Sequence, residues 1–126
     1  MEQDRTSVGL RQNVAAMLSY AGGWASGIIF LLLEHENRTI RFHAMQSILS
    51  AGFIHLVSVV GGLVLSLAPV TRANAMGFAW TVFGVGMVLW IVLMVAAYRG
   101  VTFKLPVIGH LAEKLAGASA PGKKRT

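Results

Sequence analysis

Three long windows without a charged side chain constrain this sequence more than any other feature. The windows hold 22, 30 and 26 residues, and the charged residues that limit them are Arg11, Glu34, Arg41, Arg72 and Arg99. A helix needs about 20 apolar residues to cross the roughly 30 Å hydrocarbon core of a bilayer. Each window therefore predicts a transmembrane helix, and we place the three helices at residues 13–33, 44–68 and 76–98.

The composition argues against a soluble domain. Hydrophobic residues make up 55% of the 126 residues and charged residues only 13%, about half of the roughly 25% found in average globular domains. A soluble domain of this size buries about two-thirds of its unfolded surface, so it could not hide this much apolar sequence. A soluble helical bundle would also need a polar face on each helix. The predicted fold class is all-α, an integral membrane protein with three transmembrane helices.

The remaining segments are short. Residues 1–12 form a polar N-terminal segment, and Pro69 opens a tight turn between the second and third helices because proline disfavours helix at the residue before it. Residues 99–116 alternate apolar and charged positions at helical spacing, which predicts an amphipathic helix that begins near Pro106 and lies in the membrane interface. Residues 117–126 are a basic tail that we expect to be disordered.

The distribution of Lys and Arg predicts the orientation. With three spans, the N-terminus and the second loop share one side and carry three basic residues, whereas the first loop and the C-terminus carry eight. Cytoplasmic segments are richer in Lys and Arg, so we expect a cytoplasmic C-terminus, an external N-terminus and a location in the cytoplasmic (inner) membrane. A re-entrant first segment would reverse the side of the N-terminus. The basic excess follows this orientation, and we predict no nucleic-acid partner.

Small residues recur every four positions in the first predicted span, at Ala15, Ser19, Gly23 and Gly27. Such a stripe lets two helix backbones approach closely, which drives helix association in lipid. The stripe is predicted to pack against another span of the same chain or against a second copy. A similar stripe on the second span, Ser58, Gly62 and Ser66, is its natural mate.

Polar residues mark the start of the second span. His43, Gln46, Ser47 and Ser50 lie on one helix face, at i, i+3, i+4 and i+7. Polar groups at membrane depth are costly unless they are paired, so this face should meet protein or water. Together with Glu34 and Arg41 it is a candidate partner-docking surface or polar path. The structural alternative is a hydrogen-bonded seam against the first span, with partners among Asn13, Ser19, Tyr20 and Ser26.

Three further polar features predict contacts rather than chemistry. Arg41 is expected to pair with Glu34, Glu36 or a lipid phosphate. His35-Glu36 begins like the zinc motif H-E-x-x-H, but position 39 is Thr, so we predict no metal site. His55 lies in the middle of the second span, where a neutral imidazole needs a partner on another span, and Tyr98, Ser19 and Thr81 are the candidates. We expect a structural contact there rather than a proton relay, because no second carboxylate or histidine lies at relay spacing.

Several segments together resemble a known family. They are Asn13–Tyr20 (NVAAMLSY), Trp24–Glu34 (WASGIIFLLLE), Ile40–Ser47 (IRFHAMQS), Ala97–Gly100 (AYRG) and Lys104–Gly109 (KLPVIG). They are similar to a bacterial and archaeal family of small membrane proteins of unknown function that is grouped with the chloroplast import components, the Tic-twenty-like proteins. The resemblance implies a membrane subunit of a protein-import complex, with Glu34, Arg41, His43 and Gln46 as its polar signature.

The sequence contains no catalytic set. No Ser-His-Asp arrangement, paired carboxylates or phosphate loop is visible, and the absence of cysteine excludes thiol chemistry. We therefore predict a protein that is not an enzyme and uses no cofactor. The first hypothesis is an accessory or scaffold subunit of a membrane transport or import-like complex. The alternative is a small transporter or channel formed by homo-oligomerisation. The predicted partners are the lipid bilayer and either another membrane protein or further copies.

Overall fold

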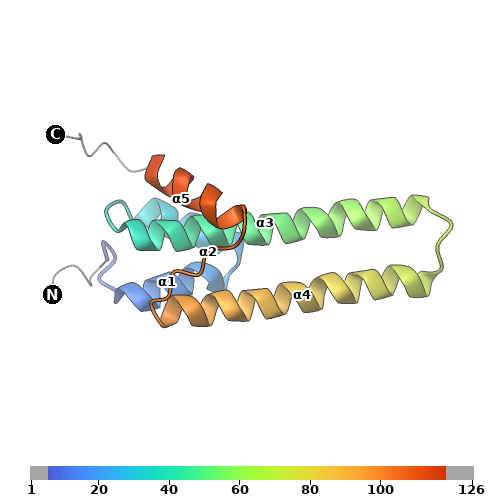
Figure 1. Ribbon diagram of the computed structural model, residues 1–126, viewed down its shortest axis with the longest axis horizontal. Coiled ribbons are helices and arrows are strands. Elements are labelled where there is room, and N and C mark those ends of the chain that lie inside the picture. The colour runs from blue at the N-terminus through green and yellow to red at the C-terminus, as the bar shows by residue number, and fades with distance from the viewer. Residues whose placement is uncertain (1–5, 119–126) are drawn as a thin grey trace.

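The computed structural model describes residues 6–118, which form five helices. These are α1 (Gln12–Ala21), α2 (Trp24–Leu33), α3 (Arg38–Leu67), α4 (Arg72–Tyr98) and α5 (Ile108–Ala118). The long helices α3 and α4 run antiparallel, while α1, α2 and α5 lie beside only one end of this pair (Figure 1). The fold is all-α, as predicted. Most of the predicted basic tail, residues 119–126, lies outside the described residues.

Helices α3 and α4 are long and apolar enough to cross a membrane. Their 30 and 27 residues correspond to lengths of about 45 and 40 Å at 1.5 Å per residue. The turn after Leu67 is where Pro69 predicted it, but both helices begin earlier than predicted. Their first residues are Arg38 and Arg72 rather than 44 and 76, because the polar residues just before them cap the helices.

The two N-caps explain these starts. The Asn37 Oδ1 accepts hydrogen bonds from the backbone N–H groups of Thr39 and Ile40, at 3.1 and 3.3 Å. Thr71 Oγ1 accepts from the N–H of Asn74 at 3.4 Å. Side-chain acceptors at this position satisfy N–H groups that have no partner within the helix.

The first predicted span, residues 13–33, is not one helix. It is divided into α1 and α2, of 10 residues each, or about 15 Å, which is half of a hydrocarbon core. The break occurs at Gly22 and Gly23, where Gly23 has a φ of 62° that other residues rarely adopt. Ser26 stabilises the turn, because its hydroxyl accepts from Gly22 N–H and donates to the carbonyl of Ser19, both at 2.9 Å.

The chain therefore runs inward along α1 and returns along α2 to the end of the molecule where α1 began. The Asn37 Nδ2 donates to Gln12 Oε1 at 3.0 Å, joining the start of α1 to the start of α3. We call α1, α2 and their turn the half-depth hairpin. The N-terminal segment and the α2–α3 loop lie at its open end, and the C-terminal helix α5 runs alongside α3 and ends there (Figure 1). The first segment does not pass the length of α3, and the described residues at both ends of the chain lie at the same end of α3 (Figure 1).

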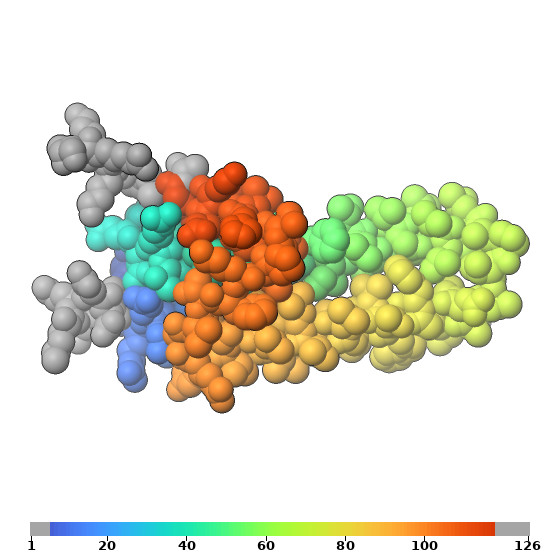
Figure 2. All heavy atoms as spheres, viewed as in Figure 1, coloured from blue at the N-terminus to red at the C-terminus, as the bar shows by residue number. Residues whose placement is uncertain are grey.

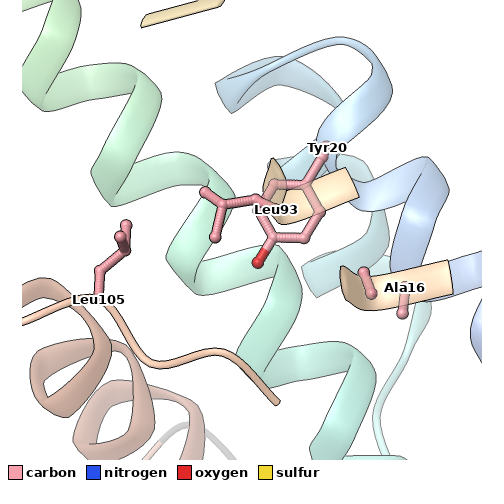
Figure 3. Packing of buried hydrophobic residues seen from close by; sticks show 5 residues of the cluster. Ala16, Tyr20, Leu93 and Leu105 are labelled. Carbon is pink, nitrogen blue, oxygen red and sulfur yellow. The ribbon is translucent and has the colours of Figure 1, made fainter. Parts of the chain in front are cut away.

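The hydrophobic core lies at this same end. Ala16 and Tyr20 of α1 pack against Leu93 and Ala97 of α4 and against Leu105 (Figure 3). Helix α5 buries Ala112 and Ala116 against Phe42 of α3. The amphipathic C-terminal helix is thus present, starting two residues after Pro106, and it packs on α3. The rest of α3 and α4 extends beyond the other helices (Figure 2).

Candidate functional site

Glu34 ties together three parts of the chain at the open end of the hairpin. Its carboxylate accepts hydrogen bonds from the N–H and the hydroxyl of Ser7, both at 2.8 Å. It also accepts from the N–H groups of Glu36 and Asn37, at 3.2 and 3.0 Å. The residue is only 1% exposed. Burial raises the pKa of this carboxyl, but these hydrogen bonds outweigh burial and hold the pKa below its usual value.

Arg41 closes the C-terminal end of α2. Its guanidinium donates to the backbone carbonyls of Leu31 and Glu34, at 3.2 and 2.7 Å. The expected ion pair with a neighbouring carboxylate is absent from the described residues; the partner on Glu34 is its backbone oxygen. A cation at a helix C-terminus is favourable, since the last carbonyls carry partial negative charge. Arg41 therefore holds α2 against α3.

His43 joins α3 to α1. Its Nδ1 lies 3.1 Å from the hydroxyl of Tyr20, and the imidazole is 2% exposed. The backbone carbonyl of the same Tyr20 accepts from the indole Nε1 of Trp90 on α4, at 2.7 Å. One residue of the half-depth hairpin thus links both long helices.

The other polar residues on the same face of α3 as His43 are also bonded within the chain. Gln46, fully buried, donates from Nε2 to the carbonyl of Phe103 at 2.9 Å. The Ser47 hydroxyl donates to the carbonyl of Gly23 at 2.8 Å, at the tip of the hairpin. Ser50 donates to the carbonyl of Ser47 at 3.3 Å. The polar residues that share one face of α3 by spacing thus form hydrogen bonds to α1, to the α1–α2 turn and to the segment before α5.

All six residues proposed for docking or a polar path are buried. They are Glu34, Arg41, His43, Gln46, Ser47 and Ser50. The cavity beside Ser47 and Ser50, at the hairpin tip, measures ≈30 Å³, which is room for about one water molecule. The arrangement corresponds to the hydrogen-bonded seam that was the structural alternative. Among the described residues, no group of three or more His, Asp and Glu side chains is placed to hold a metal ion.

The predicted packing stripe is divided by the turn. Ala15 and Ser19 are buried in α1, Gly27 is buried in α2, and Gly23 forms the turn between them. Gly27 allows the closest approach, because a Cβ there would lie 2.7 Å from the carbonyl oxygen of Ala44 and 2.8 Å from Ile48 Cγ1. The expected mate, the stripe of Ser58, Gly62 and Ser66, lies farther along α3 and is exposed.

That second stripe lines a groove between α3 and α4. The groove measures ≈840 Å³ and runs from Trp24 at the hairpin tip to Val70 and Arg72 at the α3–α4 loop. His55 and Ser58 line it from α3, and aromatic side chains including Phe83 line it from α4. We call it the α3–α4 groove. It lies where the half-depth hairpin does not reach.

Sequence reasoning missed two residues of the site. Ser7 gave no signal, because a serine in a polar N-terminal segment has many equivalent roles. The second is Trp90, whose indole bond to Tyr20 joins residues 70 positions apart. Pairings at such separations leave no trace in spacing or periodicity.

Comparison with known proteins identifies the family. The chain is 38% identical over 114 residues to UPF0132 membrane protein MJ1443 of Methanocaldococcus jannaschii, covering 87% of this chain and 93% of that protein. It is 38% identical over 109 residues to a UPF0132 membrane protein of Archaeoglobus fulgidus, covering 86% and 98%. No family model matches the chain, and no solved structure matches it. The relatives' names and the two long apolar helices agree on a membrane location, and the chain belongs to the UPF0132 family of membrane proteins.

Proposed function

We propose that this protein is a non-enzymatic scaffold or accessory subunit that assembles with another membrane-embedded chain through the α3–α4 groove. The observation that carries the proposal is the contrast between the two ends of α3. At one end every candidate polar residue is used inside the chain, whereas at the other end a groove of ≈840 Å³ stands open. A transport or import-like complex, as the family resemblance implies, is the kind of assembly in which such a subunit would serve.

The buried polar seam supports a structural role over catalysis. An active site needs reactive side chains that a substrate can reach, and the seam between α1, α2 and α3 is closed. The alternative, a small transporter with His43, Ser47 and Ser50 along a path, would require these buried residues to line an opening. The scaffold hypothesis needs no such rearrangement.

The half-depth hairpin changes the orientation that we propose. With two crossings, α3 and α4, the N-terminal segment and the C-terminal helix share one side. Among the described Lys and Arg residues, only Arg72 lies at the end of the α3–α4 loop. The others lie at the end where the hairpin opens, and they are Arg11, Arg38, Arg41, Arg99, Lys104 and Lys114. The charge bias of cytoplasmic segments supports placing both described ends in the cytoplasm and the α3–α4 loop outside.

Single cysteines test this topology directly, because the chain has none of its own. We expect Val70→Cys, in the α3–α4 loop, to react with a membrane-impermeant thiol reagent on intact cells. Val8→Cys and His35→Cys should react only after the cells are permeabilised. All three residues are exposed in the structure, so labelling after permeabilisation is the control. Reaction of both Val8→Cys and Val70→Cys on intact cells, with His35→Cys protected, would indicate three crossings and contradict the proposal, and reaction of Val8→Cys and His35→Cys alone would contradict the proposed orientation.

Photo-crosslinking tests the groove as an assembly surface. A benzophenone attached to Ser58→Cys, inside the groove, should give one discrete protein adduct in native membranes. The same label on Val59→Cys, exposed on α3 but outside the groove lining, should react only with lipid. Gly62→Phe should abolish the adduct by filling the groove, whereas Gly52→Phe should preserve it, since a Cβ at either glycine meets nothing within 4 Å. Lipid adducts alone at both positions would overturn the proposal.

A further inference from the structure

His55 is a polar residue in the middle of α3 whose side chain has no hydrogen-bond partner among the described residues. Its imidazole is exposed, lines the α3–α4 groove and makes no hydrogen bond within residues 6–118. The neighbouring hydroxyls differ, because Ser58 donates to the carbonyl of Ile54 at 2.9 Å and Ser66 donates to that of Leu63 at 2.7 Å. None of the three partners expected for His55, on the first and third predicted spans, bonds it.

The depth of His55 in the membrane makes an imidazole without a hydrogen-bond partner energetically unfavourable. It lies 12 residues before Leu67, the last residue of α3, or about 18 Å along the helix. In a hydrocarbon core of about 30 Å, it is therefore near the middle. A polar side chain at that depth turns toward protein or water and pairs there. Acyl chains in the groove would leave the imidazole unsatisfied, since they offer neither donor nor acceptor.

A second copy of this chain supplies the missing group without any further assumption. Copies in one membrane share one orientation, so a two-fold axis between them runs along the membrane normal. Each residue near that axis then meets its own counterpart at the same depth. A neutral imidazole has one donor nitrogen and one acceptor nitrogen, so two facing His55 side chains can form an N–H···N hydrogen bond.

The shape of the groove agrees with this occupant. Ser58, Gly62 and Ser66 follow His55 on the groove side of α3, and a Cβ at Gly62 would meet nothing within 4 Å. Small residues at such spacing allow helix backbones to approach closely in lipid. Two α3–α4 pairs that meet along this face beyond the hairpin tips would form a four-helix bundle over that part of their length.

We infer that the protein forms a two-fold dimer in the membrane through the α3–α4 groove, with His55 hydrogen-bonded to His55 of the partner subunit. This inference rests on the proposed function, because it names the chain that occupies the assembly surface. A foreign protein would have to carry a polar residue at the same depth, whereas a second copy has its own His55 there.

Disulfide trapping in native membranes tests the dimer. With mild oxidant, full-length Ser58→Cys should form a species of twice the mass of one chain, while Val59→Cys should remain monomeric. Mixing two differently tagged copies of Ser58→Cys should yield a species with both tags, which establishes that the adduct contains two copies.

Substitution of His55 in the Ser58→Cys background tests the hydrogen bond. We expect His55→Leu to weaken self-association about three- to tenfold, the range that membrane hydrogen bonds contribute. His55→Asn, which keeps a donor and an acceptor, should restore it. Equal association of His55→Leu and the parent would overturn the inference, as would a Ser58→Cys protein that never forms a homodimer. If a foreign protein rather than a second copy is crosslinked at position 58, the dimer is wrong but the groove remains an assembly surface. If only lipid is crosslinked there, both the dimer and the assembly surface are wrong.

Discussion

Replacing Gly27 by valine is expected to separate the half-depth hairpin from α3 and to cost about 3 kcal/mol, near the upper end for overpacking a core. The added Cβ would lie 2.7 Å from the backbone oxygen of Ala44. A backbone atom cannot rotate away as a side chain can, so α2 itself has to shift. The measurement is thermal unfolding in detergent, together with hydrogen exchange of the α2 amides, which should become faster.

The matched control for this experiment is Gly52→Val. Gly52 lies on α3, and a Cβ there would meet nothing within 4 Å. Both changes add the same atoms to a helical glycine, so the difference between them isolates the contact with α3. If the two variants unfold at the same temperature, the close approach of α2 and α3 at Gly27 is wrong.

Replacing Glu34 by alanine is expected to cost about 3 kcal/mol as well, since single hydrogen bonds to charged groups contribute roughly 1.5–3 kcal/mol and neighbouring ones are not additive. The change removes the acceptor for Ser7, Glu36 and Asn37 at once. Glu36→Ala, an exposed neighbour, is the control and should have little effect. Thermal unfolding of the three proteins at pH 7 gives the comparison, and equal loss in both variants would contradict the role assigned to Glu34.

The same carboxylate predicts a pH dependence. The pKa of Glu34 in the folded protein is below the ordinary value of 4.5, so the unfolded chain binds the proton first as the pH falls. The stability that Glu34 contributes is therefore complete above about pH 4.5 and is lost as the pH drops through the folded pKa. Glu34→Gln should unfold with a flatter pH profile in this acidic range than the wild type, and parallel profiles would argue against it.

The sequence predicts the two long helices well because each combines a long apolar window with a boundary signal that is local. Pro69 ends α3 where expected, and the periodic polar face beginning at His43 correctly indicates the side of α3 that meets protein. The earlier starts of α3 and α4 were missed because charged or polar residues, Arg38 to Arg41 above all, were placed outside the membrane and therefore outside the helices. A helix can begin in water and continue into lipid.

The division of the first segment could not be decided from hydropathy. A window of 22 uncharged residues has the same composition whether it crosses once or turns back halfway. The local signal was Gly22-Gly23, flanked by Ser19 and Ser26, but glycine is also frequent in transmembrane helices that do not turn. What decides the turn is the set of distant hydrogen bonds from Gln12, Tyr20 and Glu34, and those pairings depend on the folded chain.

The short reach of the hairpin gives the molecule unequal widths along α3 and α4. At one end α1, α2 and α5 surround the long pair, and at the other only α3 and α4 remain (Figures 1 and 2). In a bilayer such a body displaces more lipid from one leaflet than from the other. Copies gathered in one patch would add up this difference in area, and the membrane around them would relieve it by bending toward the narrow end.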